Sequence, residues 1–531
     1  MRISLRQLAV LLLLVVLTAT GCSRQPQQTE NTLRYVLEAE PATLDPAKST
    51  AIPESLAELQ LFEGLTRLDA KDRPLPGVAT QWEISADGLR YIFHLRPDAR
   101  WSNGEALTAH DFVYSWRRAL DPETASENSY MLYALKNGQA FNEKEASSED
   151  VGVRALDERT LEVTLEKPTA YFLSLASFHA FYPVHRASIE KAPESWSSQA
   201  ETLIGNGPFR LTGWVHHGSL SFAKNPYYRD AASIRLDGMY WPIVDAQATR
   251  LTLVETGQAD MMVEPPVVEH DRLQKEGLLR IAPYLGLYYY VFNTQAPPFD
   301  RLEVRRAFAL SFQRQALITH VVKGGKLPAY AWVPPGLTNP ATGLDFRQEG
   351  GDLSREDAAA AKEALQTAGY GNALPPVTLL FNTGEMHKAI AEAAQEMWKQ
   401  SLGVAVTLTN QESKVFLASR TRGEFQIARA SWIGDYADPM TFLDVFKDAT
   451  NDARYQNPRY NALIEEAQSA LDPARRMAAM HEAEQILLED AVILPIYYTT
   501  QPYVASPRLQ GVAWSVLGLA DFKNAYLLEN R

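Results

Sequence analysis

Apolar residues along the chain recur with two spacings, one typical of strands and the other of helices. Leu33–Leu37, Arg90–Leu95 and Leu161–Leu165 are short, β-prone runs, and the last alternates cleanly between apolar and polar positions. Thr108 is a suitable N-cap for a helix over Ala109–Leu120, in which Phe112, Trp116 and Ala119 share one face. The first third of the chain therefore mixes strands and helices.

The C-terminal half is richer in helical pattern. Ser354 and Asp357 form a capping-box pattern that predicts a helix ending near Gly369. Further helices are predicted at His387–Leu402, Tyr460–Leu471 and Pro473–Leu488, and further strands at Phe209–Leu211, Val404–Leu408, Glu424–Ser431 and Val492–Tyr498. Alternation of strands and helices favours an α/β fold with mixed sheets.

Composition and charge narrow the function class. The 531 residues are 46% hydrophobic and 22% charged, which is typical of a globular protein. The net charge of −13 disfavours nucleic acid or anionic lipid as the main partner. Cys22 is the only cysteine, so no intrachain disulfide can form and stability must come from packing.

The N-terminus predicts export. Arg2 and Arg6 precede the apolar run Leu8–Leu17, which is too short to span a bilayer and is typical of a signal peptide over residues 1–21. Cys22 follows Gly21 as in the bacterial lipobox, which it resembles, although Ala19 stands where that pattern prefers Leu. We expect Cys22 to be lipidated and residues 22–32 to form a polar tether. The alternative is an incidental thiol in an ordinary signal peptide.

Motifs for catalysis are missing from the sequence. There is no Walker loop, no dinucleotide-binding glycine motif and no nucleophile elbow. His481-Glu482 has Gln485 where a zinc protease needs its second His, and His216-His217 has no ligand cluster nearby in the sequence. The sequence therefore predicts neither an enzyme, nor a cofactor, nor a metal site.

Several blocks, in one consistent order, resemble the periplasmic oligopeptide-binding proteins of ABC importers, within extracellular solute-binding protein family 5. The blocks are Glu40–Pro46, Leu61–Leu65, Thr108–Trp116, Asn206–Phe209, Pro298–Asp300, Val304–Ala307, Leu327–Tyr330 and, most distinctive, Ala428–Pro439. The resemblance covers essentially all of residues 33–531.

The resemblance implies a two-lobed periplasmic-binding-protein fold of class II, cluster C, with mixed sheets, a two-strand hinge and an additional domain. The implied division gives lobe I residues 33–62, 187–285 and 502–531, the additional domain residues 63–186, and lobe II residues 286–501. The ligand would lie between the lobes, which close on it about the hinge.

The resemblance also implies a set of binding residues. Asp435 matches the residue that pairs with a peptide's α-ammonium, and Arg429, His387 and Lys323 match positions that receive its carboxylate. Backbone contacts are implied for Thr50, Ala51, Ile52, Ser431 and Ile433, and cleft-lining roles for Trp432 and Tyr130. Asn128 departs from a family tyrosine that contacts the ligand backbone, a contact that Tyr130 could supply instead.

Other interpretations of these residues remain open. Asp435 could be a surface turn residue, Arg429 part of a structural ion pair and His387 a solvent-facing helix residue. For Tyr288–Tyr290 and Trp332, core packing is favoured over a place in the binding site.

The function implied is that of a monomeric periplasmic lipoprotein that captures short peptides and delivers them to an ABC-transporter permease. It would contact the membrane only through its lipid anchor. Alternatives are a specialised solute-binding protein of the same fold (for a murein peptide, a dipeptide or a non-peptide ligand), a secreted hydrolase and a periplasmic chaperone.

Overall fold

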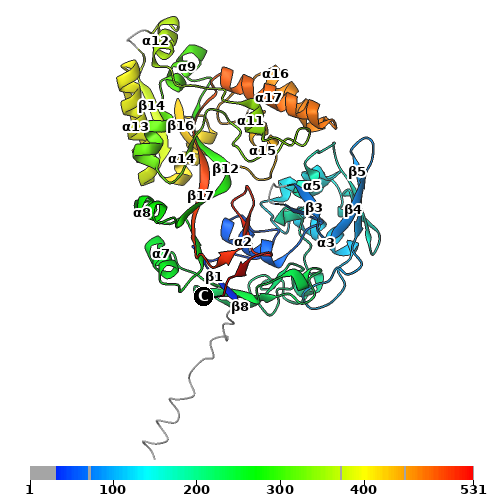
Figure 1. The fold of residues 1–531 in the computed structure, drawn as a ribbon. Coiled ribbons are helices and arrows are strands. Elements are labelled where there is room, and N and C mark those ends of the chain that lie inside the picture. Colours follow the sequence, from blue (N-terminus) through cyan, green and yellow to red (C-terminus); the bar gives the residue numbers. More distant parts are fainter. Residues whose placement is uncertain (1–30, 70–72, 371–373, 448–449, 530–531) are drawn as a thin grey trace, which may run out of the picture.

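A computed structural model describes residues 31–69, 73–370, 374–447 and 450–529 (Figure 1). Its largest sheet has eleven strands in the order β15-β14-β16-β12-β17-β11-β1-β10-β9-β8, with β13 paired to β17 beside this path. These strands are β1 (Thr32–Val36), β8 (Phe209–Val215), β9 (Ser219–Lys224), β10 (Gly238–Pro242), β11 (Met261–Val263), β12 (Leu279–Phe292), β13 (Leu327–Pro328), β14 (Val377–Asn382), β15 (Val406–Gln411), β16 (Ile427–Ile433) and β17 (Ile493–Ala505). Parallel and antiparallel pairs both occur, which confirms the mixed α/β fold class.

Two long strands, β12 and β17, connect the two halves of this sheet. They pair antiparallel, and their register shifts between Pro283 and Leu287. On one side of the shift β17 pairs with β11, and on the other β12 pairs with β16. Figure 1 shows the two strands running between the upper and lower parts of the molecule. The shift lies beside the lobe boundary that the sequence analysis expects at 285/286.

The lower part, lobe I, packs short helices on its share of the sheet. Its helices are α2 (Ile52–Leu61), α6 (Arg186–Lys191), α7 (Gln247–Glu255) and α8 (His270–Lys275). Strands from the C-terminus complete it, namely β18 (Leu509–Gln510), β19 (Ala513–Trp514), β20 (Ala520–Asp521) and β21 (Tyr526–Leu527). One apolar core joins β1 to this C-terminal segment, for example through Tyr35, Trp241 and Phe522.

The additional domain is a second, smaller sheet with order β4-β5-β7-β6, flanked by helix α3. Its elements are β2 (Thr66–Leu68), β3 (Pro74–Pro76), β4 (Ala79–Ile84), β5 (Arg90–Leu95), α3 (Ala109–Leu120), the 3-10 turn η1 (Ser129–Ala134), α4 (Gly138–Asn142), β6 (Val153–Asp157), β7 (Thr160–Thr164), α5 (Phe172–Leu175) and the 3-10 turn η3 (His179–Phe181). The predicted face of α3 is buried, and the Trp116 indole donates to the carbonyl of Phe181 at 2.8 Å.

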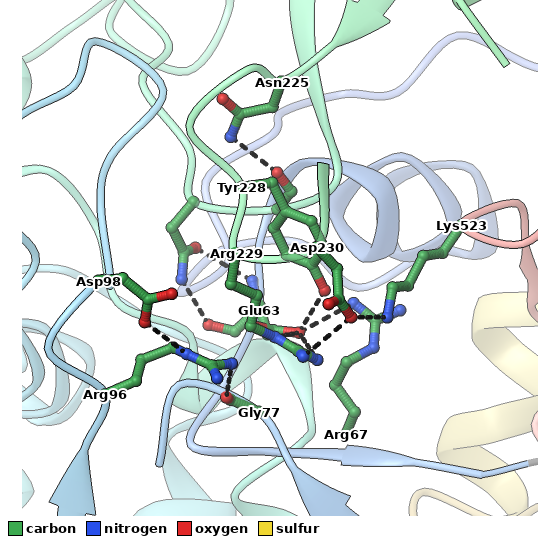
Figure 2. Close-up of polar contacts among 12 residues, drawn as sticks. Glu63, Arg67, Gly77, Arg96, Asp98, Asn225, Tyr228, Arg229, Asp230 and Lys523 are labelled. Atoms are coloured by element: carbon green, nitrogen blue, oxygen red, sulfur yellow. Dashed lines mark hydrogen bonds and ion pairs between the residues drawn. The ribbon is translucent and has the colours of Figure 1, made fainter. Parts of the chain in front are cut away.

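A buried charge network joins the additional domain to lobe I (Figure 2). Glu63, 2% exposed, accepts hydrogen bonds from Arg229 at 3.0 Å and from the Tyr228 hydroxyl at 2.6 Å, and lies 3.4 Å from Arg67. Lys523, from the C-terminal segment, pairs with Asp230 at 2.9 Å. Each charge here has a partner, so the junction is a structural network.

Lobe II surrounds its part of the large sheet with helices. They are α9 (Leu302–Leu310), α10 (Arg314–Leu317), α11 (Phe346–Gly350), α12 (Ala358–Thr367), α13 (Glu385–Leu402), α14 (Ser413–Thr421), α15 (Met440–Leu443), α16 (Pro458–Ser469) and α17 (Pro473–Glu489). Among the described residues, none of these or the other helices is both long and apolar enough to cross a bilayer.

Most of the predicted elements are confirmed to within a few residues, but two predictions need correction. Ser354 does not cap α12, because its backbone N–H donates to Tyr330, and Asp357 caps the helix by accepting from Ala360 N–H at 2.9 Å. Strand β17 extends seven residues past Tyr498, the predicted end, because it continues to pair with β12. The predicted signal peptide, Cys22 and most of the tether lie outside the described residues.

Candidate functional site

Asp435 lies at a sharp turn that ends β16. The N–H of Gly434 donates to the carbonyl of Leu285 on β12 at 2.8 Å, which is the last bond of that ladder. A Cβ at Gly434 would lie 2.6 Å from the Leu285 side chain, so any larger residue would have to displace that side chain. The N–H of Asp435 then donates to Thr441 Oγ1 at 3.0 Å. The turn therefore holds the Asp435 backbone at the end of the strand.

The Asp435 carboxylate faces a cavity of about 670 Å³ between the additional domain and lobe II. Tyr130 and Trp432 line the same cavity, and the Trp432 indole donates to the carbonyl of Thr441 at 2.7 Å. Other aromatic walls are Tyr133, Tyr171, Tyr289, Tyr436 and Phe446. The cavity thus has an aromatic lining with a carboxylate at one wall.

A second carboxylate, Asp444, lines this cavity, and the sequence analysis did not identify it. Burial, together with the nearby carboxylates of Asp435 and Asp438, raises the pKa of Asp444 to about 7. Burial also raises the pKa of Asp435, and the Tyr130 hydroxyl partly opposes that rise. Asp438 is neutralised by two 2.7 Å hydrogen bonds from Arg476. Within the described ranges, neither Asp435 nor Asp444 has an ion-pair partner. Lys167 also lines the cavity, but its Nζ contacts Gln468 at 3.3 Å, so the two carboxylates can receive a positive charge.

Arg429 lies on β16 at the end far from Asp435, and His387 of α13 lies near it. The Arg429 guanidinium lies 4.9 Å from the ring centre of Tyr288, and its Nη2 donates to Ser431 Oγ at 3.1 Å. The Tyr288 hydroxyl lies 3.3 Å from His387 Nδ1, and Tyr288 stacks on Tyr497. Burial and the Arg429 charge lower the pKa of His387 to about 4, so the imidazole is neutral at pH 7.

No acid pairs with Arg429 among the described residues, and its buried Nε has no hydrogen-bond partner. The structure therefore favours a free cation over the alternative of a structural ion pair. A carboxylate is the ligand that suits such a guanidinium, because it can accept two parallel hydrogen bonds.

Strand β16 has a free backbone edge between these two charged ends. Neighbouring strand β14 pairs with β16 only as far as Ala428. Because Gly434 donates toward β12, residues two and four positions before it also face β12, and the alternate residues Ser431 and Ile433 face outward. Among the described residues, no protein group satisfies the outward N–H and C=O of Ser431 and Ile433.

Thr50, Ala51 and Ile52 form an exposed loop and helix start on lobe I. The N–H of Ala51 is already used, because it donates to Glu54 Oε2 at 2.6 Å in a capping interaction. Thr50 has both backbone groups free within the described chain. Asn128 lies beside this loop and contacts Ser49.

Lys323 lies apart from Arg429 and His387. Its Nζ is 4.0 Å from Asp271 of α8, and it lines a separate cavity of about 350 Å³ at the edge of the hinge. Tyr288, Tyr289 and Tyr290 are all buried in the apolar cores, as is Trp332, and Tyr289 also lines the cavity beside Asp435. Tyr288 is 3% exposed, yet it forms the platform for Arg429, which local pattern could not reveal.

Metal binding finds no support in this geometry. No group of three or more His, Cys, Asp or Glu side chains in the described part of the chain could hold a metal ion. His216 and His217 instead contact one carboxylate, Glu40, at 2.7 and 2.8 Å.

Comparison with known proteins identifies relatives along the whole described chain. The family model for "Bacterial extracellular solute-binding proteins, family 5 Middle" matches residues 73–454. The oligopeptide-binding protein OppA of Bacillus subtilis is 35% identical over 522 residues, covering 96% of this chain and 95% of its own. The dipeptide-binding protein DppE of Bacillus subtilis is 37% identical over 469 residues, covering 87% and 86%.

A solved structure shows the same fold. The unliganded open form of the periplasmic murein tripeptide-binding protein MppA superimposes with a TM-score of 0.82 at 34% identity, covering 94% of this chain and 98% of that one. The cavity, the free strand edge and the lobes therefore belong to a fold that is shared over nearly the full length.

Proposed function

Since this chain belongs to the bacterial extracellular solute-binding proteins of family 5 and is not an enzyme, we propose that it captures short oligopeptides between its lobes for an ABC-transporter permease. The names of its relatives, which include oligopeptide-, dipeptide- and murein tripeptide-binding proteins, support peptides as the ligand class. No bond is made or broken. Ligand binding shifts the equilibrium between open and closed lobes, and the permease receives the closed form.

The observation that carries this proposal is the polarity of β16. A free backbone edge lies between uncompensated carboxylates at Asp435 and a free guanidinium at Arg429. Arg429 and Asp435 are six positions apart, and the extended strand from Arg429 to its last residue, Ile433, spans about 13 Å. An extended peptide matches this pattern, because it has an ammonium at one end, a carboxylate at the other and unpaired backbone groups between them.

The charges also fix the direction of the ligand. With its ammonium at Asp435 and its carboxylate toward Arg429, the peptide runs antiparallel to β16. In an antiparallel pair, alternate residues exchange hydrogen bonds with the neighbouring strand. Ligand residue 1 would pair with Ile433 and residue 3 with Ser431, while residue 2 would turn its N–H and C=O toward Thr50 on lobe I. This assignment gives each lobe a share of the ligand backbone, so the complete site forms only when the lobes close.

The lipid anchor is a further part of the proposal. Cys22 would be acylated and would hold the protein at the cell envelope through a tether over residues 22–32. Metabolic labelling with a palmitate analogue should mark the wild-type protein and not Cys22→Ser. Equal labelling of both proteins would contradict the anchor.

The experiment that tests the proposed function is calorimetry with one tripeptide in three forms. Protein freed of co-purified ligand by partial unfolding is titrated with the free tripeptide, its N-acetyl form and its C-terminal amide. We expect the free tripeptide to bind tightly and the N-acetyl form to lose most of its affinity, because acetylation removes the charge that Asp435 pairs with.

Each other outcome has a distinct meaning. Equal binding of the free and acetylated forms would discard the ammonium pair at Asp435. If the protein binds a murein-derived peptide and no ordinary tripeptide, its ligand is a specialised peptide and not oligopeptides in general. Cleavage of the peptide during incubation would contradict a binding protein altogether.

A further inference from the structure

The loop that carries Thr50 is attached to the additional domain at two points. Arg118 of α3 donates to both carboxylate oxygens of Asp45, at 2.9 and 2.6 Å, and the backbone carbonyl of Ser49, directly before Thr50, is the second point. Asn128 Nδ2, at the start of η1, donates to this carbonyl at 2.7 Å. His179 Nε2, at the start of η3, lies 3.3 Å from the same carbonyl and 3.2 Å from Asn128 Nδ2. Ser49, Asn128 and His179 are 0%, 9% and 7% exposed, so water cannot replace these contacts readily.

Hydrogen-bond chemistry defines the role of each group. The Asn128 amide nitrogen has two protons and no lone pair to accept with, so it donates to Ser49 O. The tautomer of His179 decides whether its Nε2 accepts the second Asn128 proton or itself donates to Ser49 O. Burial lowers the pKa of His179 to about 4, which keeps the imidazole neutral at neutral pH. The opposite amide orientation would direct two oxygens at each other.

Two side chains of helix α2 on lobe I bind the same loop. The Ser49 hydroxyl donates to Glu58 Oε2 at 2.9 Å, and Glu54 accepts from the N–H groups of Ala42 and Ala51 at 2.8 and 2.6 Å. Ser49 is thus held through its side chain by lobe I and through its carbonyl by the additional domain. Thr50 follows directly, and within the described chain its own backbone groups are free.

We propose that Asn128 and His179 are positioning residues for ligand binding: they fix the Ser49 carbonyl so that Thr50–Ile52 keep the orientation in which they receive the ligand backbone. The additional domain, which lies outside the two-lobe hinge, thereby contributes to affinity. The contact between Thr50–Ile52 and the ligand backbone rests on the proposed function, whereas the attachment of the loop to the additional domain can be tested without a ligand.

The test uses four variants of the full-length protein and two measurements. Asn128→Ala removes the donor to Ser49 O, and His179→Leu removes the imidazole that contacts both Asn128 and Ser49. His179→Gln keeps a side-chain amide, which can donate or accept, near the position of Nε2. The matched control is Asn225→Ala, because Asn225 (Figure 2) is also buried and donates to a backbone carbonyl, that of Gly207 at 2.8 Å, which lies beside Leu61 at the opposite end of α2 from Thr50.

Hydrogen–deuterium exchange without ligand is measured first, on fragments that cover residues 44–56 and exclude Leu61, which Gly207 contacts near the control site. We expect faster exchange in Asn128→Ala and His179→Leu, and wild-type exchange in His179→Gln and Asn225→Ala. Unchanged exchange in Asn128→Ala would overturn the attachment, whatever the ligand is.

Calorimetry with the tripeptide follows. Asn128→Ala and His179→Leu should bind about 3- to 10-fold more weakly, the equivalent of one hydrogen bond, with affinity restored in His179→Gln. Faster exchange with unchanged affinity would overturn the positioning role. If the wild-type protein binds no tripeptide, the proposed function and the peptide contact at Thr50 fail together, and the exchange result still decides whether the attachment exists.

Discussion

Replacement of Asp444 by Asn should stabilise the ligand-free protein, and the gain should grow with pH. The pKa of Asp444 rises from 3.8 to about 7, because the carboxyl is buried beside Asp435 and Asp438. A group with a raised carboxyl pKa binds its proton more tightly in the folded state, so the protein loses stability as pH increases from about 4 to 7. A rise of three pKa units corresponds to a loss of about 4 kcal/mol in the free energy of unfolding, and this loss is fully present above pH 7.

The difference between two pH values isolates this effect from other consequences of the substitution. Asn must find its own hydrogen bonds, and that cost is the same at every pH. Between pH 5 and pH 8, the advantage of Asp444→Asn over wild type should therefore increase by about 2 to 3 kcal/mol. Urea unfolding followed by tryptophan fluorescence at both pH values, with ligand removed, measures it.

Asp438 provides the matched control. It is 8% exposed, and Arg476 neutralises it with two hydrogen bonds. Asp438→Asn should destabilise the protein by about 3–5 kcal/mol, because it leaves the buried Arg476 unpaired. Stabilisation by Asp444→Asn that does not change between pH 5 and pH 8, or destabilisation at both, would refute the account of an uncompensated carboxylate in the cavity.

Three further predictions concern the two ends of β16 and the domain junction. Asp435→Asn should weaken the binding of free-amine tripeptides by about 3–5 kcal/mol and leave the binding of the N-acetyl form unchanged, measured by calorimetry. Equal losses for both forms would contradict the ammonium pair. A ligand carboxylate beside His387 should raise the pKa of the imidazole from about 4, so the affinity for peptides that reach His387 should increase as pH falls from 7 to 5. Calorimetry in two buffers of different ionisation enthalpy should detect proton uptake on binding, and His387→Leu should abolish that uptake. Glu63→Ala should lower the free energy of unfolding, measured in urea, by about 3–5 kcal/mol, because Arg229, Arg67 and the Tyr228 hydroxyl would each lose a buried partner, and a loss below 1 kcal/mol would contradict that view of the junction.

The local sequence was sufficient to predict elements whose ends and buried face are both determined by residues within the element or next to it. Helix α3 begins after Thr108 and ends at Leu120 as predicted, because one N-cap and one apolar face define it. Helix α12 shows the limit. The Ser354 pattern fits a capping box, but its N–H is bonded to Tyr330, a contact distant in sequence, so the helix begins at Ala358.

The candidate site was predictable only where one segment carries it. Asp435, Trp432 and Arg429 lie within a block that resembles the family, and the structure places the first two in one cavity. Asp444 has no motif, and its significance comes from the absence of an ion-pair partner among the described residues, which only the folded chain reveals. Tyr288 is indistinguishable by pattern from its core neighbours, and only the crossing of β12, β16 and α13 makes it a platform for Arg429.

The distribution of unpaired charge explains how one site can accept many sequences and still select peptides. Glu63 and Asp438 are buried carboxylates that have cationic partners. The two ends of one free strand edge instead have charges with no ion-pair partner among the described residues, anionic at Asp435 and cationic at Arg429. Ligand charges of opposite sign at the correct separation recover the desolvation free energy at both ends, and the backbone edge is satisfied by any extended peptide. Side chains contribute to neither requirement, so selection acts on the free termini and the direction of the chain, whereas the identity of the residues between them is left open.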